Sequence, residues 1–450
     1  MIQDAFDNQP VSVMVHACPD SKPPGYAHYI HFDETIEDYE VTIQRILDIP
    51  NMSKVTFRES LTKHFTVAFW NKINRLLVEL RQRSIPTKTG YDLFYGNDNH
   101  RFDSLQSIPL HSMYLSMREF RPNYLPNTLI SLSLLGESGF KLPPGSLPLQ
   151  LESLIIGGHF NVPILPGTFP MSLMDLKITD NFNHPLDCTN LPGSLTKLST
   201  EGSNFDQSIS NLPSSITDLR LGTMFITHPY DHTTAQTMHV NSFLPHQQFT
   251  LQYPLLRDLS IWSYEMVDVT SITPANFPML ERLNCKICYK GSEFSTLPTM
   301  LRRLYFEPDI SEPLDISRGI VPKLKPYIAL PANLERLTIY GHIPLNRLPT
   351  ICVDNLPSCL THLRVHSPTY FIDPVKLPPG IKKIHYTNVT PDHYNNLLRH
   401  LPNSLTVLKL RFRQQKITNK YMRLSDTMFI KFQAKTVLLC GFIDLNTMFL

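Results

Sequence analysis

One short pattern, L-P-x-x-L-x-x-L-x-L, returns along the chain at nearly constant intervals. Its clearest copies begin at residues 125, 147, 169, 191 and 212, which are steps of 22, 22, 22 and 21 residues. A degraded copy begins at residue 108, and copies one residue shorter begin at residues 253 and 277. The full form returns at residues 297, 330, 356, 377 and 401. Internal repeats of this length are typical of solenoids, in which each repeat is one structural unit.

Each part of the pattern has a physical role. The segment L-x-x-L-x-L ends in an alternation of apolar and polar residues, which predicts a half-buried strand. Proline has no N–H to donate to a sheet, so we expect it just before the strand. One unit buries too few leucines to offset an ordering cost of about 1–2 kcal/mol per residue, so the units must stack. We therefore expect a curved parallel solenoid, mainly β to α/β, with one short strand per repeat.

A second motif lies between the predicted strands. It reads GGHFNVPI from residue 157, DNFNHPLD from residue 180 and, more weakly, GSNFDQSI from residue 202. Together the two motifs resemble the FNIP repeat, a relative of the leucine-rich repeat that is expanded in social amoebae. The resemblance covers about residues 105–412 and is strongest between residues 125 and 222.

The resemblance implies roles for residues of the second motif. In leucine-rich folds the strands line a concave face, and the Phe and Asn of each unit fill the opposite side. Phe160, Phe182 and Phe205 are then expected to stack as a spine in the core. By the same resemblance, Asn161 and Asn183 are expected to hydrogen-bond to loop backbone.

The flanks of the repeats differ in composition, which predicts the domain organisation. Residues 1–23 are polar and proline-rich and are expected to form a flexible tail. Residues 24–104 alternate strand-like and helix-like stretches and are expected to form an α/β cap. The solenoid is assigned to residues 105–412, with an insertion at about 227–250, and a C-terminal cap to residues 413–450.

Composition and charge restrict the class of protein. The formal net charge is only +2, which favours no particular partner, so any charge argument must be local. No apolar stretch reaches the roughly 18 residues of a membrane span, and the first residues have neither a basic start nor an apolar core. Seven cysteines scattered along the 450 residues fit a reducing compartment. We expect a cytoplasmic protein with no membrane contact.

No catalytic motif is apparent in the chain. Cys285 and Cys288 form a lone C-x-x-C, and Cys285 occupies an apolar position of its repeat, so a buried thiol is favoured over zinc or a disulfide. His228, His232, His239 and His246 cluster in the insertion, where a solvated loop is favoured over a metal site. We therefore expect no catalytic residues, no cofactor and no metal.

The x positions of the strands point away from the predicted core, and their charges are uneven. At the x positions of the repeats that begin at residues 125 to 253, acidic and basic residues balance, whereas in the repeats that begin at residues 277 to 401 eight basic residues face only Glu281 and Glu335. This basic strip is a candidate partner-binding site. It comprises Arg282, Arg302, Arg303, Arg336, Arg364, Lys382, Lys383 and Lys409, with His362 and His385 nearby.

The strip predicts an acidic or phosphorylated protein segment as the partner. Nucleic acid is disfavoured because no row of base-stacking aromatic residues accompanies the strip, Tyr305 excepted. The leading hypothesis is a non-catalytic protein–protein interaction scaffold. One alternative is a ubiquitin-ligase adaptor with a degenerate F-box in residues 35–90, and another is an enzyme that uses a metal in the His-rich insertion. The sequence indicates neither the identity of the partner nor the oligomeric state.

Overall fold

The computed structural model divides the chain into two compact units, residues 1–232 and residues 233–450. Apart from a few isolated residues, it describes residues 11–16, 28–31, 52–59, 88–93, 110–117, 125–136, 140–222, 231–241, 251–262, 271–287, 297–308, 330–340, 351–352, 356–366, 370–371, 374–389, 397–412, 418–433 and 436–445.

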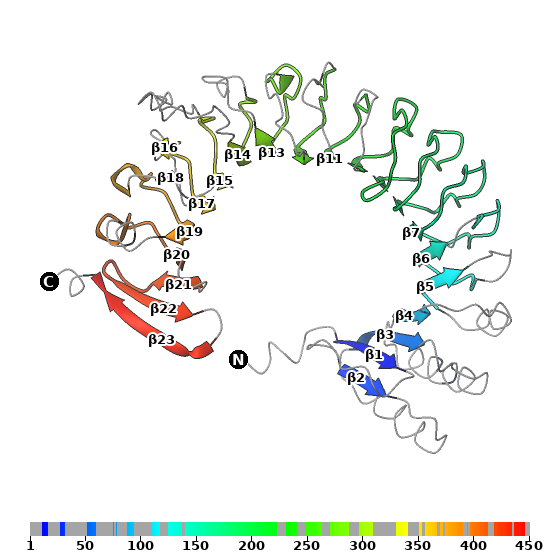
Figure 1. The fold of residues 1–450 in the computed structure, drawn as a ribbon, viewed down its shortest axis with the longest axis horizontal. Coiled ribbons are helices and arrows are strands. Elements are labelled where there is room, and N and C mark those ends of the chain that lie inside the picture. The colour runs from blue at the N-terminus through cyan, green and yellow to red at the C-terminus, as the bar shows by residue number, and fades with distance from the viewer. Residues whose placement is uncertain are drawn as a thin grey trace, which may run out of the picture. The chain divides into compact units, whose positions relative to one another are not determined.

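The first unit is built on a run of parallel strands. Its strands are β1 (Val11–His16), β2 (His28–His31), β3 (Met52–Glu59), β4 (Lys88–Leu93), β5 (Ser112–Met117), β6 (Ser131–Gly136), β7 (Ser153–Gly158), β8 (Asp175–Ile178), β9 (Lys197–Ser199) and β10 (Asp218–Leu221). From β3 to β10 each strand pairs with the next along the chain, and β1 pairs with both β2 and β3. Figure 1 shows these strands side by side.

The second unit continues the same architecture and ends differently. Its strands are β11 (Thr237–Asn241), β12 (Asp258–Trp262), β13 (Arg282–Ile287), β14 (Arg303–Pro308), β15 (Arg336–Tyr340), β16 (Ile351–Cys352), β17 (His362–His366), β18 (Tyr370–Phe371), β19 (Lys383–Val389), β20 (Val407–Phe412), β21 (Thr418–Arg423), β22 (Met428–Gln433) and β23 (Thr436–Asp444). A short 3-10 turn, η6, spans Pro374–Lys376. Strands β11 to β20 form one parallel sheet without β16 and β18, which pair with each other. Antiparallel β21, β22 and β23 then extend the sheet from β20.

The L-P-x-x-L segment is a turn that delivers the chain into each strand. The proline carbonyl accepts a hydrogen bond from the N–H of the residue three positions later, as in Leu195 N to Pro192 O at 3.1 Å and Leu301 N to Pro298 O at 3.1 Å. A serine before the second leucine adds a bond between repeats: the hydroxyl of Ser194 donates to the carbonyl of Leu173 at 2.9 Å. Proline therefore serves as an acceptor in a position where no donor is needed.

Equivalent positions of successive repeats are in register. Leu154 pairs with Leu132 on one side and with Leu176 on the other, and all three are fully buried. Each repeat thus covers the apolar face of its neighbours, which confirms the stacking that the periodicity predicts. All thirteen copies of the pattern contain a strand, so the predicted parallel solenoid is confirmed.

The aromatic spine implied by the family resemblance is present. The Phe182 ring stacks on Phe160, with centroids 5.9 Å apart, and on Phe205, with centroids 6.3 Å apart. The predicted asparagine bonds are also present. Asn161 Oδ1 accepts from the backbone N–H of Asn183 at 3.1 Å, and Asn183 Oδ1 accepts in turn from that of Asp206 at 2.9 Å. These side chains connect the loops of successive repeats.

Two sequence expectations differ from the structure. Residues 1–23 are not wholly a tail, because Val11–His16 form β1, where valines alternate as in a half-buried strand. The insertion at about 227–250 contains β11, in register with β12. Its buried residues Ala235, Met238 and Val240 stand where other repeats have leucine, so a pattern written in leucines does not detect this unit. The helix-like stretches at residues 35–49 and 61–82, and most of the F-box alternative, lie outside the described residues.

Candidate interaction surface on the second unit

Strands β13, β14, β15 and β17 of the second unit bury alternate side chains. Leu283, Leu304, Leu337 and Leu363 are buried in β13, β14, β15 and β17. Side chains of a strand alternate between faces, so the residues between the buried ones all point to the opposite side. We call this side of β11–β20 the open face.

Strand register gathers the charged residues of the open face into two rows. Neighbouring strands lie about 4.8 Å apart, so residues more than twenty positions apart in sequence become direct neighbours. The first row runs Arg282, Arg303, Arg336, His362 and Lys383. The second row runs Tyr305, Thr338, Arg364, His385 and Lys409.

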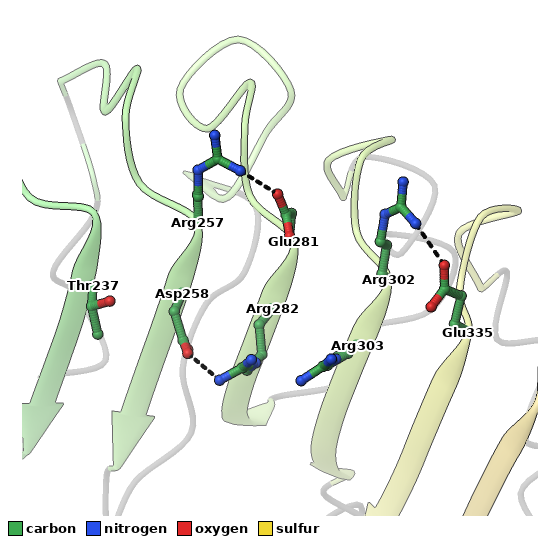
Figure 2. A pocket seen from close by; sticks show the side chains of 8 residues that line it. All are labelled: Thr237, Arg257, Asp258, Glu281, Arg282, Arg302, Arg303 and Glu335. Atoms are coloured by element: carbon green, nitrogen blue, oxygen red, sulfur yellow. Dashed lines mark hydrogen bonds and ion pairs between the residues drawn. The ribbon is translucent and has the colours of Figure 1, made fainter.

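Carboxylates neutralise the part of the strip nearest β12. Arg282 Nη1 lies 2.6 Å from Asp258 Oδ2, and Arg302 Nη1 lies 2.7 Å from Glu335 Oε1. A third pair joins Arg257 to Glu281 at 2.7 Å. These pairs line a hollow of about 600 Å³, and Figure 2 shows Arg303 in it beside Arg282. Two of the predicted site residues, Arg282 and Arg302, are therefore already paired.

Most of the other predicted residues, without Arg303 and Lys382, line a recess between β15, β17, β19 and β20. The recess has a volume of about 280 Å³. Six nitrogen-bearing side chains line it: Arg336, His362, Arg364, Lys383, His385 and Lys409. Lys382, one residue before β19, is exposed. Within the described part of the chain, neither Lys382 nor any of the four cations in the recess forms an ion pair with a carboxylate.

The histidines of the open face experience a positive field. Burial, and then the charges of Arg336, Lys383, Lys382 and Arg303, lower the pKa of His362. Burial and neighbouring cations also lower the pKa of His366 to about 4 and that of His385 to about 4, with a further contribution to His385 from His366. Because burial, and then the neighbouring cations, disfavour the imidazolium form, these rings are neutral near pH 7. The positive charge of the face is therefore carried by arginine and lysine alone.

An aromatic row crosses the same face, contrary to the sequence expectation. Tyr305 stacks on Tyr340 with ring centroids 4.7 Å apart, and Tyr340 lies 4.3 Å from His366. Trp262 continues the row beyond Tyr305 at 6.2 Å, and His385 continues it beyond His366 at 5.1 Å. The repeat pattern does not indicate this row, because Trp262, Tyr340 and His366 lie one position after the last residue of L-x-x-L-x-L.

The cysteine and histidine candidates for metal binding are placed separately. Cys285 is buried in β13, where burial raises the pKa of its thiol. His232 is buried, with Nε2 2.8 Å from the carbonyl of Ile216, and His239 lies in β11. Cys288, His228 and His246 lie outside the described residues. Among the residues that are described, no three His, Cys, Asp or Glu side chains are placed to share a metal, and no helix is long and apolar enough to cross a membrane.

Part of the repeat region matches a known family of repeats. The model of the FNIP repeat matches residues 140–181 and 182–223. No curated protein sequence matches the chain.

Several solved structures are similar to the chain. They include CroV588, a circular leucine-rich-repeat protein (TM-score 0.49, 18% identity, covering 86% of this chain and 56% of that one). A chain of the Toll–Spatzle complex of Drosophila gives a TM-score of 0.40 at 13% identity and covers 80% of this chain and 46% of that one. An internalin of Listeria monocytogenes gives a TM-score of 0.30 at 14% identity, and the match covers 81% of this chain and 82% of that one. The chain thus spans about half the length of the first two.

Proposed function

We propose that this chain, which carries FNIP repeats at residues 140–223 within a leucine-rich-repeat-like solenoid, is a non-catalytic binding protein. Its partner is an acidic segment of another protein, and the segment lies across the open face of β14–β20. Such a face suits an extended segment, because it offers one set of side chains every ~4.8 Å along a line perpendicular to the strands.

The observation that carries this proposal is the unpaired charge of the face. Six cations have no acidic partner within the described residues: Arg303, Arg336, Arg364, Lys382, Lys383 and Lys409. Like charges that are directly opposite on neighbouring strands destabilise a sheet. Arg303 stands opposite Arg336, so the arrangement does not serve folding. An acidic partner would remove this repulsion and would be attracted over about one Debye length, roughly 8–10 Å at moderate salt.

Affinity capture from a native lysate tests the proposal. The bait is the full chain or its variant Arg303→Glu/Arg336→Glu/Lys383→Glu, and cross-linking with mass spectrometry identifies the captured segments. A matched control, Lys141→Glu/Lys177→Glu/Lys197→Glu, makes the same change of net charge in the first unit. We expect acidic segments to be captured by the wild type and by the control, and to be lost with the open-face variant.

Partners that bind the open-face variant and the wild type equally would contradict the proposal. Partners lost equally with both triple variants would contradict it as well, because net charge rather than the open face would then decide binding.

A further inference from the structure

We propose that the recess between β15, β17, β19 and β20 binds a phosphorylated side chain of the partner segment. The inference rests on the proposed function, because it assumes that a protein segment lies on the open face. It adds the chemical group that this part of the face recognises.

The lining of the recess matches a multiply charged anion. Arg336, Arg364, Lys383 and Lys409 carry four full positive charges and come from four different strands. Among the described residues that line it there is no carboxylate. The neighbouring hollow is largely neutralised, because Arg257, Arg282 and Arg302 are each held by a carboxylate at 2.6–2.7 Å, and among its described arginines only Arg303 has no such pair. The unpaired charge is therefore concentrated in the recess.

The donors of the recess are arranged around a point rather than along a line. Arg336, His362 and Lys383 lie side by side in the first row, and Arg364, His385 and Lys409 lie side by side in the second row. Within a strand, the two rows are separated by two residues, which is about 6.6 Å. A group held between the rows can thus receive hydrogen bonds from several directions. The volume of about 280 Å³ leaves room for a tetrahedral group and its stem.

This arrangement favours phosphate over carboxylate. A carboxylate of Asp or Glu has one charge and two oxygens in one plane, so it would leave most of the four cations without a partner. A phosphate monoester carries a charge of about −1.5 to −2 and three acceptor oxygens. It can accept a two-pronged bond from a guanidinium group and still accept from lysine on another side.

The aromatic row argues against single-stranded nucleic acid. Proteins that hold single strands stack bases on open aromatic faces. Here the face of Tyr340 is covered by Tyr305 at 4.7 Å on one side and by His366 at 4.3 Å on the other. Tyr340 therefore offers a ligand its ring edge rather than an open face. Ring edges carry the positive end of the quadrupole and suit an anion better than a base.

Binding of defined peptide mixtures to the full chain tests the inference. The probes are fluorescent peptides with randomised flanks around one fixed residue, which is phosphoserine, phosphotyrosine, serine or glutamate. We expect one of the phosphorylated mixtures to bind at least about tenfold more tightly than both the serine and glutamate mixtures, because charge-assisted bonds to phosphate are stronger and more numerous. Fluorescence anisotropy gives the dissociation constants, and labelled polyuridine serves as a nucleic-acid probe.

Two double variants separate the recess from its surroundings. Arg336→Gln/Arg364→Gln removes two unpaired guanidinium groups and should weaken phosphopeptide binding about 30-fold. Arg257→Gln/Arg282→Gln removes two guanidinium groups from the paired hollow. This variant should change the dissociation constant of the phosphopeptide less than about twofold. All four arginines are exposed, so circular dichroism should show both variants folded.

Each other result has a distinct meaning. Equal binding of the glutamate and phosphorylated mixtures would overturn the inference and leave the proposed function standing. Binding of no mixture above the serine level would contradict both. Equal losses in the two double variants would place the site outside the recess and overturn the inference. Tighter binding of polyuridine than of any peptide, lost in Arg336→Gln/Arg364→Gln, would overturn it in favour of nucleic acid.

Discussion

Replacement of Phe182 by alanine tests whether the aromatic spine holds the first unit together. The Phe182 side chain is fully buried and stacks on rings on both sides, at 5.9 Å and 6.3 Å. A buried Phe→Ala change costs about 3–5 kcal/mol, and each aromatic pair contributes about 0.5–1.5 kcal/mol beyond burial. We therefore expect a loss of about 4–5 kcal/mol. Phe182→Leu, which keeps most of the apolar volume, should cost about 1–2 kcal/mol.

Hydrogen exchange measured by mass spectrometry is the suitable assay, because repeats contact only their neighbours and the loss should be local. Amides of β7, β8 and β9 should exchange on the order of 10³-fold faster in Phe182→Ala. Met171→Ala is a matched control, since Met171 lies in the same repeat and is 71% exposed. A variant Phe182→Ala that loses no more protection than Met171→Ala would refute the role of the spine.

Three further predictions follow from local chemistry. Arg303→Gln should raise the free energy of unfolding by on the order of 1 kcal/mol, because Arg303 lies between two other arginines in the first row, and a lowered stability in urea titration would contradict this. Burial and nearby cations hold the pKa values of His366 and His385 at about 4, so the folded state binds fewer protons than the unfolded state. The stability they provide should be complete above pH 6.5 and be lost as the pH falls toward 4, by less than about 3 kcal/mol per ring because both rings are partly exposed to solvent. The pH dependence should flatten in His366→Gln/His385→Gln, and an unchanged pH dependence would show that these rings are not its source. Buried Cys285 should resist a thiol reagent that modifies exposed Cys188, and equal rates by mass spectrometry would show that its site opens.

The sequence predicts the strands because they depend on residues within one repeat, whereas the spine was implied by the resemblance to the FNIP repeat. About ten consecutive residues determine the turn at Pro192 and the strand that follows it. The stacking of these units follows from the nearly constant length of the repeat. The repeat that contains Ala235 does not match the leucine pattern, because other apolar residues can replace leucine where the packing permits. Local patterns identify an element, whereas packing decides which apolar residue it can use.

The site could be predicted only in part, because contacts between repeats depend on register. The sequence places Asp258 in a charge-balanced half of the chain, whereas register brings it next to Arg282 of the following repeat. The stack of Tyr305 on Tyr340 joins residues from two repeats that occupy different positions of the pattern. No spacing within one repeat indicates such pairs. The basic character of the face was predictable, but its concentration in one recess was not.

Photo-cross-linking from a single position on the open face tests the central claim most directly. A photoreactive amino acid replaces Thr338, which lines the recess on β15, and a control chain carries it at Ser199, the equivalent position of β9 in the first unit. We expect acidic or phosphorylated partner segments to cross-link from position 338. We expect none of these segments to cross-link from position 199. Cross-links of the same segments from position 199 and none from position 338 would contradict the assignment of the open face of the second unit as the binding site.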